Sequence, residues 1–71
     1  MYVKILEDDQ TTIIECAKLK IEDVDNGTMR MLFLDDIERF TYDPEGDPPG
    51  IFVENNEGKT INAIQYRKIQ K

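Results

Sequence analysis

The Asn26-Gly27 pair is the feature of this sequence that most restricts its fold. Both residues accept the positive φ angles that a two-residue type I′ turn requires, so the pair predicts a tight β-hairpin. Counting outward from the turn places Val24 opposite Met29, and the register then continues toward the far ends of both strands. The next predicted pairs are Asp23 with Arg30, Ile21 with Leu32, and Leu19 with Leu34. We therefore expect antiparallel β-structure in the middle of the chain.

The same period-two alternation of apolar residues marks further short strands along the chain. Strands are expected at residues 2–6, 29–34, 39–42 and 51–54, with Val3 and Ile5 on one face of the first. Residues 11–24 are too long for one simple strand, and their alternation changes phase. A β-bulge or bend near Ala17 and Lys18 would explain that change. Residues 35–38 are predicted to be a connector, in which an aspartate could cap a single helical turn.

The second half of the sequence contains a predicted loop and a second hairpin. Residues 43–50 hold three prolines and two glycines, so we expect an exposed acidic loop there. Residues 55–59 match a three-residue hairpin loop with Gly58 in the left-handed region. This loop would place Val53 opposite Ile61 and Ile51 opposite Ala63. Beyond Ala63 the pattern is compatible with either a continued strand or a short helix.

These elements together indicate an all-β chain. We expect residues 1–71 to form a single small domain, an antiparallel barrel or curled sheet of five to six short strands. An SH3-like barrel with a possible short C-terminal helix is the specific arrangement we predict. With 71 residues, the hydrophobic core must be thin.

Composition argues against several classes of function. The chain has no His, no Ser and one Cys, so the usual catalytic triads and Cys/His zinc sites cannot be assembled from it. We expect a non-enzymatic protein without a cofactor. No apolar run approaches the roughly 20 residues of a membrane span, and no secretory signal pattern is present. A reducing, cytoplasmic location is the corresponding expectation, with Cys16 as a buried structural thiol.

One acidic segment has spacing that resembles a calcium-binding loop. Asp43, Glu45, Asp47 and Glu54 fall at positions 1, 3, 5 and 12 of such a loop. Pro48, however, occupies the position where the sharp turn of the loop requires Gly, and strands rather than helices are predicted on both sides. We therefore interpret the segment as a solvated acidic turn and predict no metal site.

Charge is distributed unevenly along the chain. The sequence has 15 acidic and 9 basic residues, a net charge of −6, whereas residues 1–58 alone carry −10. Such a surface disfavours direct nucleic-acid binding. It can either keep a small protein soluble or mimic DNA and occupy a nucleic-acid-binding protein. The carboxylates that we assign to this possible partner-binding face are Asp35, Asp36, Glu38, Glu45 and Asp47.

The C-terminal residues have the opposite charge. Residues 59–71 contain four bases and no acid, among them Arg67, Lys68 and Lys71. This tail could contact an acidic partner, but a terminus that balances the acidic body is the simpler interpretation.

An apolar stripe provides the other candidate contact surface. Met29, Met31 and Phe33 alternate along one strand whose opposite face is also apolar. In a closed barrel they would belong to the core, whereas in an open sheet they would form a surface for association. We therefore hypothesise a non-enzymatic interaction module that binds a protein partner or itself, with residues 43–50 as a further contact. The alternative hypothesis is an acidic DNA-mimic decoy that inhibits a nucleic-acid-binding protein. Short acidic chains without catalytic machinery are typical of small accessory proteins, including those of phages and mobile elements.

Overall fold

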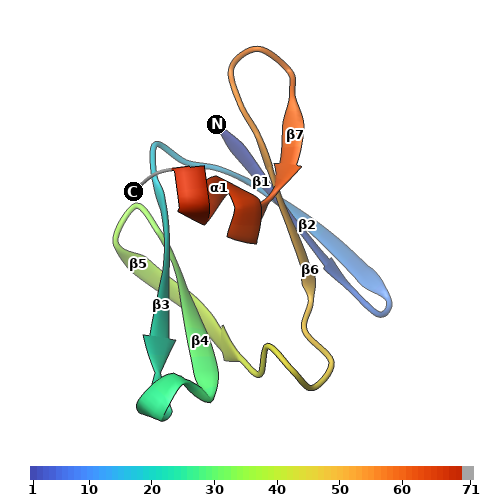
Figure 1. The fold of residues 1–71 in the computed structure, drawn as a ribbon. Helices are drawn as coiled ribbons and strands as arrows, with labels where there is room; N and C mark the ends of the chain where they lie inside the picture. The colour runs from blue at the N-terminus through green and yellow to red at the C-terminus, as the bar shows by residue number, and fades with distance from the viewer. Residues whose placement is uncertain (70–71) are drawn as a thin grey trace. The chain divides into compact units, whose positions relative to one another are not determined.

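A computed structural model describes residues 1–69 of the chain. The strands are β1 (Tyr2–Glu7), β2 (Gln10–Glu15), β3 (Leu19–Val24), β4 (Met29–Leu34), β5 (Ile37–Tyr42), β6 (Gly50–Glu54) and β7 (Thr60–Asn62). A 3-10 turn, η1 (Asp25–Gly27), joins β3 to β4, and one helix, α1 (Ala63–Ile69), follows β7 (Figure 1). The expectation of a mainly β chain with antiparallel strands is confirmed, with seven strands instead of five or six.

The strands form two antiparallel sheets, each within its own compact unit. The first unit combines Met1–Cys16 with the chain from Pro49 onward, and its sheet has the order β2-β1-β6-β7. The second unit is Ala17–Pro48, and its sheet is the meander β3-β4-β5. Within residues 1–69 these two sheets do not close into a barrel, so the SH3-like arrangement stays a prediction.

In the first unit, β1 is a central strand because both of its edges are paired. Val3 pairs with Ile14 of β2 on one side and with Val53 of β6 on the other. Alternate residues of β1 and β6 face inward, which confirms that Val3 and Ile5 share one face of β1. The buried side chains of this unit are Val3, Ile5, Cys16, Ile51, Val53 and Ala63.

The hairpin predicted at residues 55–59 is present, and it leads into the helix. Gly58 has φ +80° and donates its N–H to the carbonyl of Asn55 at 3.0 Å, and Val53 pairs with Ile61. The predicted pairing of Ile51 with Ala63 is wrong, because the ladder ends at Asn62. The side-chain Oδ1 of Asn62 accepts the N–H of Ile64 at 2.8 Å, which caps the first turn of α1. Residues 63–69 are therefore helical.

In the second unit, the β3–β4 hairpin has the predicted register throughout, from Val24 with Met29 to Leu19 with Leu34. Asn26 and Gly27 have φ of +56° and +85°, and the N–H of Thr28 bonds the carbonyl of Asp25 at 3.1 Å. Ile21, Leu32 and Leu34 are buried on one face of this sheet.

The chain bends between β2 and β3, at the place where the sequence predicted a bulge or bend. A bend at Ala17 separates Glu15, the last residue of β2, from Leu19, the first of β3. The two strands belong to different sheets, so the change of phase marks a passage from one sheet to another rather than a bulge within one.

The predicted connector at residues 35–38 is wrong. Leu34 pairs with Ile37, which leaves Asp35 and Asp36 as a two-residue turn with φ of +53° and +66°. Ile37 and Glu38 already belong to β5. Aspartate is a helix-capping residue, but it also tolerates the left-handed region, and here the second property decides the structure.

Candidate functional site

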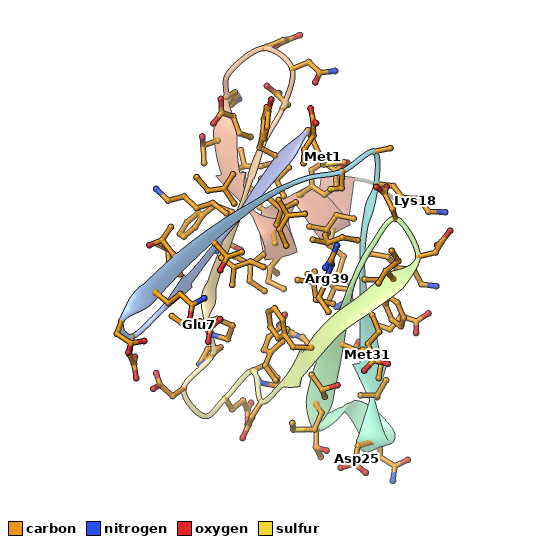
Figure 2. All side chains as sticks on the ribbon, turned by 180° about the vertical axis from the view of Figure 1, so that it is seen from behind. Met1, Glu7, Lys18, Asp25, Met31 and Arg39 are labelled. Carbon is orange, nitrogen blue, oxygen red and sulfur yellow. The ribbon has the colours of Figure 1, made fainter. Side chains whose placement is uncertain are left out.

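The apolar stripe lies on one face of the three-stranded sheet. Met29, Met31 and Phe33 alternate along β4 and each is half-buried, whereas Leu32 and Leu34, on the opposite face of the strand, are buried. Figure 2 labels Met31 of this stripe. Residues that are directly opposite in an antiparallel pair share a face. The stripe is therefore flanked by Glu22 and Lys20 of β3 and by Thr41 and Glu38 of β5.

Charged side chains form the rim of this stripe. The Lys20 ammonium lies 5.3 Å from the centre of the Phe33 ring and 2.8 Å from a carboxylate oxygen of Glu22. The hydrogen bond and the charge of Glu22 raise the pKa of Lys20 above its ordinary 10.5. Lys20 therefore stays protonated at neutral pH, and the face combines apolar side chains with a charged border.

Two of the carboxylates that we assigned to the partner-binding face, Asp35 and Asp36, also have contacts inside the second unit. The Asp35 Oδ1 accepts the N–H groups of Ala17 and Lys18 at 2.9 and 3.0 Å, and the Asp35 N–H donates to the Lys18 carbonyl at 3.0 Å. The Asp36 carboxylate forms an exposed ion pair with Lys18 at 2.9 Å. The turn between β4 and β5 thereby fixes the entry of the chain into β3.

The other predicted carboxylates, Glu38, Glu45 and Asp47, are exposed. In the loop after β5, the Asp43 Oδ1 accepts the N–H of Glu45 at 2.9 Å, so this carboxylate orders the loop that carries it. Within residues 1–69 no group of three or more Asp, Glu, Cys or His side chains is arranged to hold a metal ion.

The second unit also has a hollow that the sequence analysis missed. It has a volume of about 610 Å³ and is lined by residues 26–28, Arg30 and residues 43–45. Arg30 is half-buried, and its Nε lies 3.3 Å from the Asp23 carboxylate, which confirms the predicted pairing. The hydrophobic pattern holds no signal for this hollow, because turn residues that precede β4 and follow β5, at one end of the β4–β5 ladder, line it together with Arg30.

A second apolar surface was also missed, on the outer face of the four-stranded sheet. Ile13 is 62% exposed and Tyr2 is 49% exposed. Lys4 separates Ile13 from Phe52 in one cross-strand row, and the Phe52 ring lies close to Gly50 of the same strand. The consecutive apolar residues Ile13 and Ile14 were the available signal, because neighbours in a strand point to opposite faces.

The remaining candidates are placed as follows. Cys16 is buried, as predicted, and its backbone exchanges two 2.9 Å hydrogen bonds with Met1. In the C-terminal tail, Arg67 is half-buried on α1. Lys71 lies outside the described residues, and so does the predicted contact that would use it.

No known protein family matches this chain, no curated protein matches its sequence, and no solved structure matches its fold. No helix within residues 1–69 has both the length and the apolar character that crossing a membrane requires.

Proposed function

We propose that this chain is a small, non-enzymatic interaction module that binds a partner protein through Met29, Met31 and Phe33. One observation carries the proposal. The stripe stays half-buried while the opposite face of the same strand is buried at Leu32 and Leu34. An apolar row with a charged rim is the usual anatomy of a protein-binding surface.

The residue types of the stripe support this role. Methionine side chains are flexible and polarizable, so they adapt to the contours of different apolar partners. An aromatic ring such as Phe33 supplies a large contact area. We expect the partner to present apolar side chains toward the stripe and polar groups toward Lys20 and Glu22. We further propose that the protein acts in a reducing compartment such as the cytoplasm. Binding through the stripe does not require an SH3-like barrel.

The five carboxylates of the acidic-decoy alternative are all exposed. Asp35 and Asp36 also have partners inside the second unit, so their side chains contribute to its structure. Neutralising Asp35 would disturb the acceptor of two backbone N–H groups, so it would test the stability of the second unit rather than the decoy hypothesis. The suitable variant is Glu38→Gln/Glu45→Gln/Asp47→Asn.

The test is affinity capture from the source organism's lysate with elution in rising salt, followed by calorimetry with the purified partner. At about 1 M salt the Debye length is about 3 Å, so a contact between apolar surfaces persists while a charge-driven contact is lost. We expect one partner to be retained through high salt. Its affinity should fall at least about tenfold in both Met31→Lys and Phe33→Glu, a loss of about 1.4 kcal/mol.

A matched control separates the surface from general effects of charge. Gln65→Lys introduces the same side chain as Met31→Lys at an exposed position of α1 and should keep the affinity of the unmodified chain. Undiminished binding by both stripe variants would overturn the proposal. A nucleic-acid-binding protein that elutes at moderate salt, and that the triple neutral variant no longer captures, would establish the decoy instead.

A further inference from the structure

Strand β2 differs from the other edge strands of the two sheets. Within residues 1–69, β2, β7, β3 and β5 each have a hydrogen-bonded neighbour on one side only. Edge strands usually avoid further pairing by being short, charged or bulged. β7 has three residues, β3 has three charged residues among six, and β5 has two charged residues and a register shift opposite Leu32 and Phe33. β2 has six residues, a regular register and a single charge, Glu15.

The register shows which backbone groups of β2 face outward. Met1 and Cys16 exchange two backbone hydrogen bonds, and such pairs alternate with non-bonded pairs along an antiparallel ladder. The bonded pairs of β2 with β1 are therefore those of Ile14, Thr12 and Gln10. Thr11, Ile13 and Glu15 direct their N–H and C=O groups away from β1, and all three residues are exposed.

These outward groups are complementary to a second copy of the same strand. If Ile13 of one copy lies opposite Ile13 of the other across a two-fold axis, Thr11 lies opposite Glu15 at both ends. This register aligns outward donors with outward acceptors in every bonded pair. It also places a hydroxyl donor, rather than a like charge, opposite each carboxylate.

The same register extends the outer apolar row. Phe52, Lys4 and Ile13 follow one another across β6, β1 and β2. Two-fold pairing brings the second Ile13 next to the first, so the side chain that is 62% exposed in one chain becomes partly covered. Removing apolar surface from water then adds to the backbone hydrogen bonds.

We propose that the chain forms a symmetric homodimer in which two β2 strands pair antiparallel and join the two four-stranded sheets. This inference is independent of the proposed function, which uses a face of the other sheet. The dimer would present two Met29, Met31 and Phe33 stripes to partner proteins.

The test is the oligomeric state measured by sedimentation equilibrium over a roughly hundredfold range of concentration. The unmodified chain should approach twice its monomer mass as its concentration rises. Ile13→Lys should shift it to the monomer, since two lysines would meet on the two-fold axis. That variant also lowers the net negative charge from −6 to −5, so stronger overall repulsion could not explain the loss.

Two further variants keep the test specific. Ile37→Lys makes the same change at an exposed isoleucine on the edge of the other sheet and should leave the dimer intact. Thr11→Pro removes an outward N–H that β1 does not use, and it should weaken the dimer at least about tenfold while far-UV circular dichroism stays unchanged. A monomer at every concentration, or a dimer that both β2 variants leave unaffected, would overturn the proposal.

A residue-level measurement provides an independent check. Hydrogen exchange at the amides of Thr11, Ile13 and Glu15 should slow as concentration rises, whereas the amides of Thr12 and Ile14, which pair with β1, should change little. Slowing confined to residues 29–33 would place the contact on the stripe and contradict the β2 interface.

Discussion

At the scale of single residues, the turn at Asp35 and Asp36 shows that residue type alone does not predict the structural role of a side chain. Both aspartates have positive φ, which costs an L-residue roughly 1–2 kcal/mol. Asp35 offsets this cost through two backbone N–H groups, whereas Asp36 has one exposed ion pair. Exposed ion pairs of that kind contribute little to stability. The two neighbours should therefore respond differently to the same substitution.

We expect Asp35→Gly to lower the free energy of unfolding by about 1 kcal/mol, because the N–H groups of Ala17 and Lys18 lose their acceptor. Asp36→Gly should be neutral or slightly stabilising, since glycine relieves the positive φ and only a surface ion pair is lost. Urea unfolding followed by circular dichroism measures both variants. Equal effects of the two substitutions would show that the carboxylate of Asp35 has no structural role.

At the scale of elements, turn chemistry explains which parts of the fold could be predicted. The Asn26-Gly27 turn specifies the register of β3 with β4, and Gly58 specifies that of β6 with β7, because each requirement acts within a few residues. The prediction failed at residues 35–38, where aspartates suit both a helix cap and a left-handed turn. It also left residues 64–69 undecided between strand and helix, since six residues of mixed pattern support either.

Substitution of the turn glycine tests this explanation. Gly27 has φ +85°, and an added Cβ would meet no atom within 4 Å, so the cost of Gly27→Ala is conformational only. We expect this variant to lose about 1 kcal/mol of stability, and Gly27→Asn to lose less because asparagine tolerates the left-handed region. Thermal unfolding of both variants measures the difference. A more stable alanine variant would contradict the assignment of the turn.

At the scale of the whole molecule, charge and apolar surface act in opposite directions. The net charge of −6 opposes compaction and association through repulsion. The ion pairs of Lys18 and Lys20 are solvent-exposed and offset little of it. An apolar surface nevertheless remains accessible on each sheet. The proposed function uses the Met29, Met31 and Phe33 stripe, and the proposed homodimer uses the row that contains Ile13.

The dependence of the melting temperature on salt shows whether repulsion between carboxylates or attraction within ion pairs contributes more to stability. We expect added sodium chloride to raise the melting temperature, by an amount corresponding to about 1 kcal/mol or less, because it screens repulsion among the carboxylates. The Glu38→Gln/Glu45→Gln/Asp47→Asn variant has a net charge of −3 and should show a smaller rise. Scanning calorimetry at several salt concentrations measures both chains. A melting temperature that falls with salt would mean that ion pairs outweigh repulsion.

The candidate sites also differ in how far local sequence could predict them. Met29, Met31 and Phe33 could be assigned to one face from alternation alone, because the period of a strand is a local property. The contacts of Asp35 and the surroundings of Ile13 could not, because each depends on a part of the chain distant in sequence. Asp35 accepts the N–H groups that precede β3, and Ile13 lies on an exposed face of β2, which has one hydrogen-bonded neighbour within residues 1–69.

Local chemistry in the chain thus predicted most of its strands and the register of its two glycine-containing hairpins, but not the tight turn at Asp35 and Asp36. Tertiary structure decided that β1 pairs with both β2 and β6, that β3 begins a second sheet, and that the chain ends its described part in a helix. The physical reason is that burial of apolar side chains is non-directional: it selects which face of a strand turns inward but not which distant strand lies beside it. Backbone donors and acceptors are the same in every strand, so that choice depends on the packing and hydrogen bonding of all the strands of a sheet together.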